Sequence, residues 1–577
     1  MQVSEALLGS RVAIQCARRA HNDHDPTLAD LPLTVVPVSR WAIQGIEFEA
    51  AVVEQLTSTL GDSCTDLRSL GHRDAAAATV DAMASGVPVI IGAALPDDSQ
   101  GHRRGRPDLL VRNRQRADGA WGYFPADIKS HQVVRPTKTG AVSTADLDKL
   151  ANPDANTTRT GLSPNSSHRL SDLMQLAHYW RMLEACGHAS DGDPVGGLVG
   201  SDTFAAETPY LVWQSLTEPV FTTFSRSRGT AQRSALERYD HEFDFRVRVI
   251  DVAEQQGEPH APLPLVRPVI IDECDSCPWH DVCFQDVGDD EPSAHVVSGR
   301  LGLREWNALR VVGVVSVHDL AGLSLDDPRL ASYWPELDIK ESRARSRLEN
   351  AVTRAQMSIV GERLRPTGQP IPQVPRADVE VDFDLEWDAD NRIYLWGLLV
   401  SDGSGQRLES VYSWDPLDGE GETDLASVAI ARLVALRREA DSSGRSFRVY
   451  HYSHPEVSMV RNLIKGGGPH PWPSEQWWEA FTAECFVDLL PIVKSGFIGL
   501  RGLGLKEVAQ AAGFTWQDDD PGGEQSMDWI EEARRGGDPE AREAARRRLL
   551  DYNTDDVRAT RAVREWLVSG NRLITDI

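Results

Sequence analysis

One stretch of the chain alternates strictly between apolar and acidic residues, and few folds accommodate such a stretch. Residues 377–387 read ADVEVDFDLEW. The apolar positions are Val379, Val381, Phe383 and Leu385, and the acidic positions are Glu380, Asp382, Asp384 and Glu386. A period of two residues predicts a β-strand with one apolar and one acidic face. Four like charges on one face repel one another, so we expect cations against it, and a metal site would supply them.

The residues that follow continue the pattern of a mixed α/β domain. Residues 393–400 (IYLWGLLV) come after a polar turn and predict the second strand of a hairpin. A long helical pattern covers 422–440, and residues 446–453 (SFRVYHYS) predict another strand. This β-β-α-β order is typical of an RNase H-like fold.

The last predicted helix, residues 540–567, carries the specific element of this domain. Tyr552 and Asp556 are four residues apart in it and therefore share one face. An early D-x-E strand and a late Y-x-x-x-D helix resemble the DEDDy 3′–5′ exonucleases of the YprB-like RNase H-like group. Residues 504–514 (GLKEVAQAAGF) also resemble the stretch before the last motif of such enzymes. The resemblance implies that Asp384, Glu386 and Asp556 bind two Mg²⁺ or Mn²⁺ ions and that Tyr552 positions the attacking water.

Two ligand positions remain open at this stage. The family pattern has a central aspartate after the strand at 446–453, where this chain has Glu456, and Asp488 is a second candidate. Asp382 competes with Asp384 as the first ligand. Because a glutamate reaches further than an aspartate, a site that has lost its activity is the alternative.

Residues 106–131 of the first half predict a hairpin with a second set of acids. Residues 109–111 and 123–128 have the composition of strands, and a polar turn at 117–119 joins them. The hairpin places Asp108 on one strand and Asp127 and Lys129 on the next. Two carboxylates and a lysine suit metal-dependent phosphodiester hydrolysis, since the acids hold Mg²⁺ and the lysine orients or deprotonates the attacking water. A surface salt-bridge cluster is the alternative.

Two predicted helices flank this hairpin in the sequence. Glu49 lies in the helical pattern at 45–56, and Gln175 and Tyr179 share one face of the pattern at 171–183. The order of helix Glu, PD, DxK and QxxxY resembles the RecB-like exonucleases of the PD-(D/E)xK superfamily, which have a restriction-endonuclease-like fold. The resemblance implies metal ligands at Glu49, Asp108 and Asp127, a catalytic Lys129, and a DNA path lined by Gln175 and Tyr179.

Three of the seven cysteines lie close together in CDSCPWHDVC, at Cys274, Cys277 and Cys283. In a chain without secretory features such a cluster predicts metal binding before disulfides. With Cys16 upstream, the arrangement resembles the iron–sulfur RecB-like nucleases. The resemblance implies that the four thiolates hold a [4Fe–4S] cluster that ties the ends of the domain together. Zinc is the alternative, with His280 able to replace Cys16.

We therefore predict an α/β chain with four parts: a RecB-like nuclease domain with an iron–sulfur staple (1–290), a helical segment (296–365), a proline-rich linker (366–376) and an RNase H-like exonuclease domain (377–577). Residues 303–323 resemble a helix–hairpin–helix that binds the DNA backbone, with a plain helical spacer as the alternative. The polar residues 134–168 predict a long loop or a partly disordered insertion.

Composition narrows the function. Lys and Arg total 60 against 87 Asp and Glu, a net charge of −27, which excludes a basic nucleic-acid coat. Any nucleic-acid site must therefore carry metal ions or clustered basic residues. No apolar run approaches the ~18 residues of a membrane span, and the N-terminal residues lack a secretory signal pattern, so we expect no membrane association and a cytoplasmic location.

Together these patterns predict a metal-dependent nuclease that hydrolyses DNA from its ends in repair, recombination or defence. Nothing in the residues excludes RNA. No G-x-x-x-x-G-K-[ST] motif is present, so unwinding would need a separate helicase partner. The alternative is a nucleic-acid-binding scaffold with one or both sites inactive.

Overall fold

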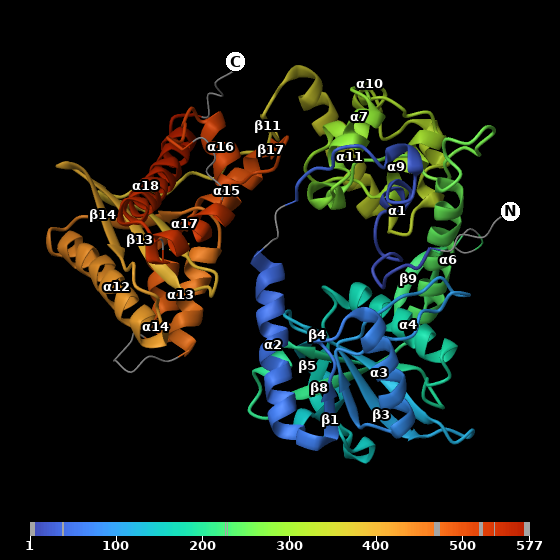
Figure 1. Ribbon diagram of the computed structural model, residues 1–577. Helices are drawn as coiled ribbons and strands as arrows, with labels where there is room; N and C mark the ends of the chain where they lie inside the picture. Colours follow the sequence, from blue (N-terminus) through green and yellow to red (C-terminus); the bar gives the residue numbers. More distant parts are fainter. Residues whose placement is uncertain are drawn as a thin grey trace. The chain divides into compact units, whose positions relative to one another are not determined.

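The computed structural model describes residues 6–36, 40–225, 227, 229–466, 474–518, 523–535 and 537–570. The chain forms two compact units (Figure 1). Unit 1 comprises residues 1–289, 302–313 and 326–345, and unit 2 comprises residues 290–301, 314–325 and 346–577. Among the described residues no helix has the length and the apolar character that crossing a membrane requires.

Unit 1 is built on an eight-stranded mixed sheet with the order β1-β2-β3-β4-β7-β8-β5-β6. Its strands are β1 (Cys64–Asp66), β2 (Val89–Ile91), β3 (Leu109–Gln115), β4 (Trp121–Lys129), β5 (Val134–Asp146), β6 (Thr157–Pro164), β7 (Val195–Gly200) and β8 (Tyr210–Ser215). A separate hairpin consists of β9 (Phe221–Ser225) and β10 (Gly229–Arg233). Strand β4 is antiparallel to β3 and parallel to β7.

Helices cover both faces of this sheet. Helix α2 (Arg40–Leu60) lies on one face, and α3 (His72–Ser85), α4 (Arg169–Ala185) and α6 (Ala235–Ala253) lie on the other. The other helices of unit 1 are α1 (Ala17–Asn22), α5 (Ser201–Phe204), α7 (His280–Val287) and α9 (Leu303–Val311). Leu109 and Val111 of β3 face α2, whereas Leu110 between them packs with α3, α4 and α6. The alternation of side chains along a strand thus divides the apolar residues between two cores.

The predicted hairpin at 106–131 is confirmed, because β3 and β4 pair with Leu109 opposite Ala126. The predicted loop at 134–168 is wrong. Residues 134–146 and 157–164 are strands β5 and β6, which pair with each other and join the sheet through β8. Their threonines and valines favour extended backbone, and a polar sequence suits the edge of a sheet, where few side chains need burial.

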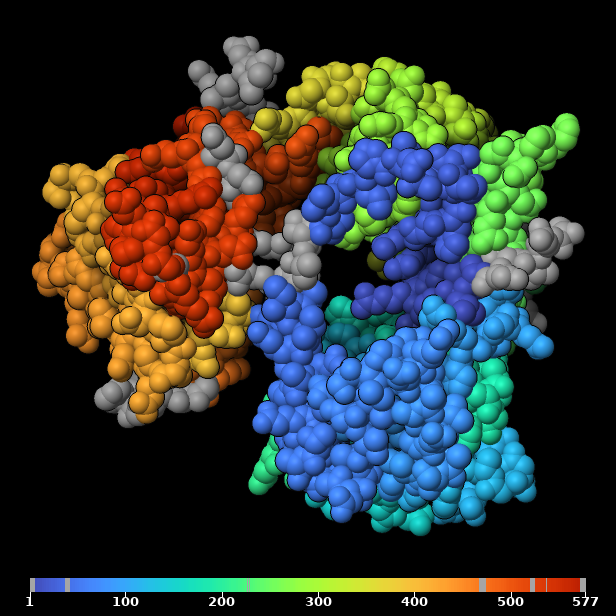
Figure 2. Space-filling view, in the orientation of Figure 1, coloured from blue at the N-terminus to red at the C-terminus, as the bar shows by residue number. Residues whose placement is uncertain are grey.

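The N-terminal helix α1 and the cysteine-rich residues near 274–283 lie side by side although they are far apart in sequence (Figures 1 and 2). The backbone N–H of Cys16 donates to Glu273 Oε1 at 2.9 Å. The indole N–H of Trp279 donates to Asp23 Oδ1 at 2.6 Å. These two hydrogen bonds join the N-terminal residues 16–23 to residues 273–279.

Unit 2 contains a five-stranded sheet with the order β14-β13-β12-β15-β16. Its strands are β12 (Val379–Trp387), β13 (Ile393–Asp402), β14 (Gly405–Tyr412), β15 (Phe447–His451) and β16 (Phe486–Asp488), and a small ribbon pairs β11 (Leu364–Pro366) with β17 (Phe497–Gly499). The predicted hairpin and the later strand are confirmed, but β14 had no counterpart in the prediction.

Helices lie on both faces of this sheet: α12 (Gly419–Ser442), α13 (Pro455–Gly466) and α14 (Glu475–Cys485) on one, and α18 (Pro539–Val568) on the other. Unit 2 also contains α8 (Pro292–His295), α10 (Val317–Ala321), α15 (Leu489–Gly496), α16 (Leu505–Ala511) and α17 (Gly523–Arg535), and α11 (Glu341–Val360) has residues in both units. The apolar face of β12 packs on α12 and α14, as its alternation predicts. The acidic face turns toward α18.

Candidate active site in unit 2

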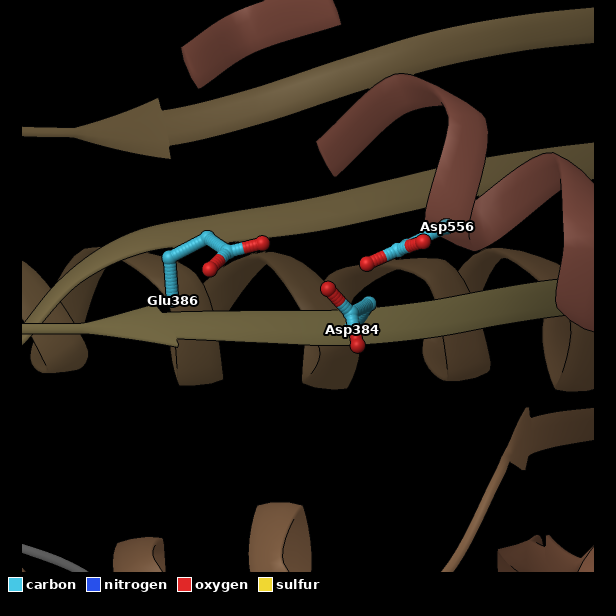
Figure 3. A group of neighbouring side chains, drawn as sticks. All are labelled: Asp384, Glu386 and Asp556. Atoms are coloured by element: carbon cyan, nitrogen blue, oxygen red, sulfur yellow. The ribbon is translucent and has the colours of Figure 1, made fainter. Parts of the chain in front are cut away.

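Strand β12 and helix α18 bring three carboxylates together (Figure 3). One oxygen each of Asp384, Glu386 and Asp556 lies within 4.8 Å of the other two. Among the described residues this is the one set of three or more His, Cys, Asp or Glu side chains gathered so closely. Glu386 and Asp556 are buried, whereas Asp384 is partly exposed. The three acids could hold a divalent cation.

Neighbouring side chains fix two of these carboxylates. Asn553 Nδ2 donates to Asp384 Oδ2 at 2.8 Å, and the Trp516 indole donates to Asp556 Oδ1 at 2.7 Å. Asn553 fits only because Gly397, the cross-strand partner of Asp384, has no side chain. A Cβ at Gly397 would lie 2.0 Å from Asn553 Oδ1.

The site carries uncompensated negative charge. Burial, followed by the charges of Asp556 and Glu386, raises the pKa of Asp384 well above its usual value. Burial and Asp556 do the same to the pKa of Glu386. Burial raises the pKa of Asp556 to about 6, although Trp516 and Lys506 act in the opposite direction. Carboxylates that repel one another in this way gain most from a bound cation.

Tyr552 lies one helical turn before Asp556 on α18. Its hydroxyl accepts a hydrogen bond from Lys506 Nζ at 3.3 Å, and Trp529 packs edge-on against its ring with 5.7 Å between centroids. Burial, followed by the charge of Asp556, raises the pKa of Tyr552, so the phenol keeps its proton at neutral pH. Sequence reasoning noted the stretch that contains Lys506 but assigned that residue no role.

Glu456 and Asp488, the two candidates for the fourth acidic ligand, have different surroundings in the structure. Glu456, in the first turn of α13, is buried, and its Oε2 has no hydrogen-bond partner, with His451 Nδ1 3.6 Å away. The charge of Glu456 also contributes to the raised pKa of Asp384. Asp488 instead caps α15 and accepts hydrogen bonds from two backbone N–H groups at 2.9 and 3.0 Å.

Arginine side chains neutralise Glu380 and Asp382, the first two acids on the acidic face of β12. The expectation that a metal site explains all four acids is therefore corrected. Arg564 of α18 is fully buried and binds both oxygens of Asp382, at 2.9 and 2.8 Å. It also donates to Glu380 at 2.5 Å, and Arg376 binds the same glutamate at 2.6 and 2.9 Å. Asp382 is therefore engaged, and it is Asp384 that joins the acidic group.

In unit 1 the predicted PD and DxK residues lie next to one another on β3 and β4. The backbone N–H of Ile128 donates to Asp108 Oδ2 at 2.7 Å, and the N–H of Asp108 donates to Asp127 Oδ1 at 3.5 Å. Lys129 Nζ donates to Asp127 Oδ2 at 3.2 Å and to Gln175 Oε1 at 2.8 Å. The helix that carries Gln175 is thereby joined to the hairpin.

The other two predicted residues of unit 1 differ in exposure. Tyr179 is buried, accepts a hydrogen bond from Gln175 at 3.0 Å and donates to the carbonyl oxygen of Arg106 at 3.1 Å. Glu49, on α2, is partly exposed. Its charge adds to burial and to the charge of Asp127 in raising the pKa of Asp108 well above its usual value.

Lys129 remains an ammonium in this arrangement. Burial acts to lower the pKa of Lys129, but the charges of Asp127, Asp108 and Asp172 outweigh it and raise the pKa above its ordinary value. The lysine therefore acts here as a donor and as a positive charge rather than as a base.

The four cysteines singled out in the sequence line one small pocket, together with Trp279 and His280. Two of them accept weak hydrogen bonds: Asn22 Nδ2 lies 3.6 Å from Cys283 Sγ, and the N–H of Ile271 lies 3.4 Å from Cys274 Sγ. Burial raises the pKa of Cys283 to about 11. His280 is paired with Asp281, at 2.8 Å.

Comparison with known families identifies the C-terminal domain. The family model of the RNase_H superfamily matches residues 381–568, the segment that contains the three gathered carboxylates. No curated protein and no solved structure matches the chain at the significance required. This match supports an RNase H-like domain at residues 381–568, and members of that superfamily generally hydrolyse phosphodiester bonds with divalent metal ions such as Mg²⁺.

Proposed function

We propose that residues 377–577 form a DEDDy-type 3′–5′ exonuclease that acts on DNA. Asp384, Glu386, Asp556 and Glu456 hold two Mg²⁺ or Mn²⁺ ions, and Tyr552 positions the attacking water. The observation that carries this proposal is the group of three carboxylates within 4.8 Å, inside a domain that matches the RNase_H superfamily.

The donor set fits such ions. Carboxylate oxygens are the ligands that Mg²⁺ and Mn²⁺ prefer. A bound cation would relieve the repulsion that raises the pKa of Asp384, and it would give a ligand to the buried Oε2 of Glu456, which makes no hydrogen bond and lies 3.6 Å from His451 Nδ1. When bound, the ions would supply a water of lowered pKa and would stabilise charge on the attacking and leaving oxygens.

The protein's own groups do the positioning. Asn553 keeps the carboxylate of Asp384 in place beside the other two acids. The protonated Tyr552 can hold a water by a hydrogen bond beside the carboxylates. The charge of Lys506 acts on both Glu386 and Asp556, and this positive charge favours the approach of a phosphate.

We propose a second nuclease site in unit 1, of the RecB-like PD-(D/E)xK type. Asp108, Asp127 and Glu49 are its metal ligands, and Lys129 stabilises the charge that develops on the phosphate. The contacts of Lys129 with Asp127 and with Gln175 support this reading, because they hold the ammonium between the acids and α4. A surface salt-bridge cluster does not account for acids as buried as Asp127.

We propose that Cys16, Cys274, Cys277 and Cys283 hold a [4Fe–4S] cluster. Four thiolates form the ligand set that such a cluster needs. A tetrahedral zinc site with bonds of about 2.3 Å places its sulfurs only about 3.8 Å apart. The four cysteines line one small pocket, so one group can meet all four sulfurs.

A nuclease assay on anaerobically purified protein tests both sites. Substrates are end-labelled single- and double-stranded DNA, with Mn²⁺, and RNA is a second substrate. The variants are Lys129→Ala, Asp384→Ala and the double variant. Matched controls are Lys149→Ala, an exposed lysine of unit 1, and Asp390→Ala, an exposed aspartate beyond β12.

The proposal expects each single variant to abolish one set of products and the double variant to abolish all cleavage, while the controls cleave like wild type. On strands labelled at the 5′ end, loss in Asp384→Ala of the products shortened from the 3′ end assigns 3′–5′ polarity to unit 2. Absence of cleavage of both DNA and RNA by the iron-loaded wild type contradicts the proposal and favours a nucleic-acid-binding scaffold. A separate helicase and a role in repair, recombination or defence belong to the same proposal.

A further inference from the structure

Two histidines stand at the base of the long β5–β6 hairpin of unit 1. His131 comes two residues after Lys129, just before β5, and His168 comes just after β6, at the start of α4. Their rings stack with 4.2 Å between centroids. Sequence analysis assigned neither residue a role, yet the fold places both beside the proposed unit 1 site.

A buried carboxylate holds the first of these rings. His131 Nε2 lies 3.0 Å from Asp172 Oδ2, and Asp172 is only 5% exposed. Asp172 belongs to the first turn of α4, and Gln175, which binds Lys129, follows one turn later. One turn of α4 rises about 5.4 Å, so Asp172 and Gln175 lie close together on this helix. Through these two side chains α4 holds His131 and Lys129 side by side.

The imidazole of His131 is more exposed than the lysine and the aspartate of the DxK motif. The side chain of His131 is 27% exposed, whereas that of Lys129 is 14% exposed and Asp127 is fully buried. The titratable groups in contact with the ring are Asp172 and His168. The carboxylate of Asp172 fixes the ring and balances the charge of an imidazolium, as in other His–Asp pairs.

The substrate of the proposed site is a polyanion, and this region of the chain is rich in acids. The charges of Asp108, Asp127 and Asp172 act on Lys129, and the charge of Glu49 acts on Asp108. Nucleic-acid binding depends on cations at backbone phosphates. An imidazolium at the rim of the site is suited to bind the phosphate next to the one that is hydrolysed.

We infer that His131, held by Asp172, is a substrate-binding residue of the unit 1 nuclease and contacts a backbone phosphate of the strand beside the scissile bond. The inference rests on the proposed function of unit 1 and adds a substrate contact to it. A purely structural clamp at the base of the hairpin is the competing account, and the experiment separates the two.

The experiment uses the full chain carrying Asp384→Asn, so that cleavage reports unit 1 alone. Cleavage of single-stranded DNA is measured at pH 6, with Mn²⁺, over a series of salt concentrations. Imidazoles are largely protonated at this pH. Each phosphate contact contributes about 0.7 to the slope of log affinity against log salt for single strands. The variants are His131→Gln, His131→Lys and, as a matched control on the surface of α6, His241→Gln.

We expect His131→Gln to raise KM about 5- to 20-fold with kcat within about twofold, and to reduce the salt slope by about 0.7. His131→Lys restores both KM and slope because it returns the positive charge, and His241→Gln changes neither. A clamp predicts a different pattern, in which both His131 variants lower Tm and the lysine restores nothing. That pattern overturns the inference.

The failure of the inference differs from the failure of the proposed function. If His131→Gln cleaves with the KM and salt slope of its parent while Lys129→Ala abolishes cleavage, the nuclease stands and the phosphate contact is wrong. If the Asp384→Asn chain does not cleave, or cleaves equally well with Lys129→Ala, the unit 1 nuclease itself is wrong, and the inference falls with it.

Discussion

The buried ion pair between α18 and β12 offers the sharpest test of how unit 2 is assembled. Arg564→Met removes the guanidinium and leaves Asp382, which is 0% exposed, and Glu380, which is 4% exposed, facing an apolar side chain. Removing one partner of a buried pair costs about 3–5 kcal/mol, because the remaining charge stays buried without compensation. For a domain of about 200 residues each kcal/mol lowers Tm by about 2–4 °C. The expected decrease is therefore about 6–20 °C.

Differential scanning calorimetry of the metal-free chain measures this decrease. Arg376→Met is the matched control, since Arg376 binds the same Glu380 but its side chain is 42% exposed. Exposed pairs contribute about 0–1 kcal/mol, so the control lowers Tm by less than about 4 °C. The double variant Arg564→Met, Asp382→Leu removes both charges and recovers most of the loss.

Two results refute this reasoning. If Arg564→Met unfolds at the same temperature as Arg376→Met, the ion pair is not the contact that holds α18 on the sheet. If Asp382→Asn abolishes cleavage and Asp384→Asn does not, the assignment of the two aspartates is reversed.

Three further predictions concern the sites themselves. Tyr552→Phe lowers cleavage by unit 2 about 10²-fold or more while Mn²⁺ affinity, measured by calorimetric titration, stays within about threefold, because the hydroxyl orients water rather than the metal. The pKa of Asp556 is raised from 3.8 to about 6 in the folded chain, so its contribution to the stability of the metal-free domain is full below pH 4 and is lost as the pH rises through 6. Mn²⁺ therefore raises Tm more at pH 7.5 than at pH 5, and an equal rise at both values contradicts this assignment. Cys277→Ser removes iron and the absorption near ~400 nm from anaerobically purified protein, whereas a colourless, zinc-containing wild type contradicts the cluster.

Local patterns in the sequence predicted the elements that carry the chemistry. The alternation in residues 379–387 specified a strand with an apolar and an acidic face, and the structure packs the apolar face on α12 and α14. The four-residue spacing of Tyr552 and Asp556 placed both on one face of α18. Such inferences succeed because side-chain direction follows from the period of the backbone alone.

Patterns of polarity alone were less reliable. Residues 134–168 lack apolar alternation, so they predicted a loop, yet most of them form strands β5 and β6. Edge strands need little apolar surface, and their stability comes from hydrogen bonds to a neighbour that is distant in the sequence. Strand β14 was overlooked for the same reason, since its inner partner β13 supplies the pairing.

The sequence by itself determined which residue types were available and which way the side chains of the strongly patterned elements β12 and α18 point, because both depend on neighbours a few positions away. Only the tertiary structure decided which acids meet. It paired Asp382 with Arg564, 182 residues away, and so left Asp384 for the acidic group. It assigned Asp488 to a helix cap and left Glu456 unpartnered. An aspartate or glutamate becomes a metal ligand or an ion-pair partner according to the side chains that pack against it. Packing brings together residues that are far apart along the chain, and a local sequence pattern does not contain that information.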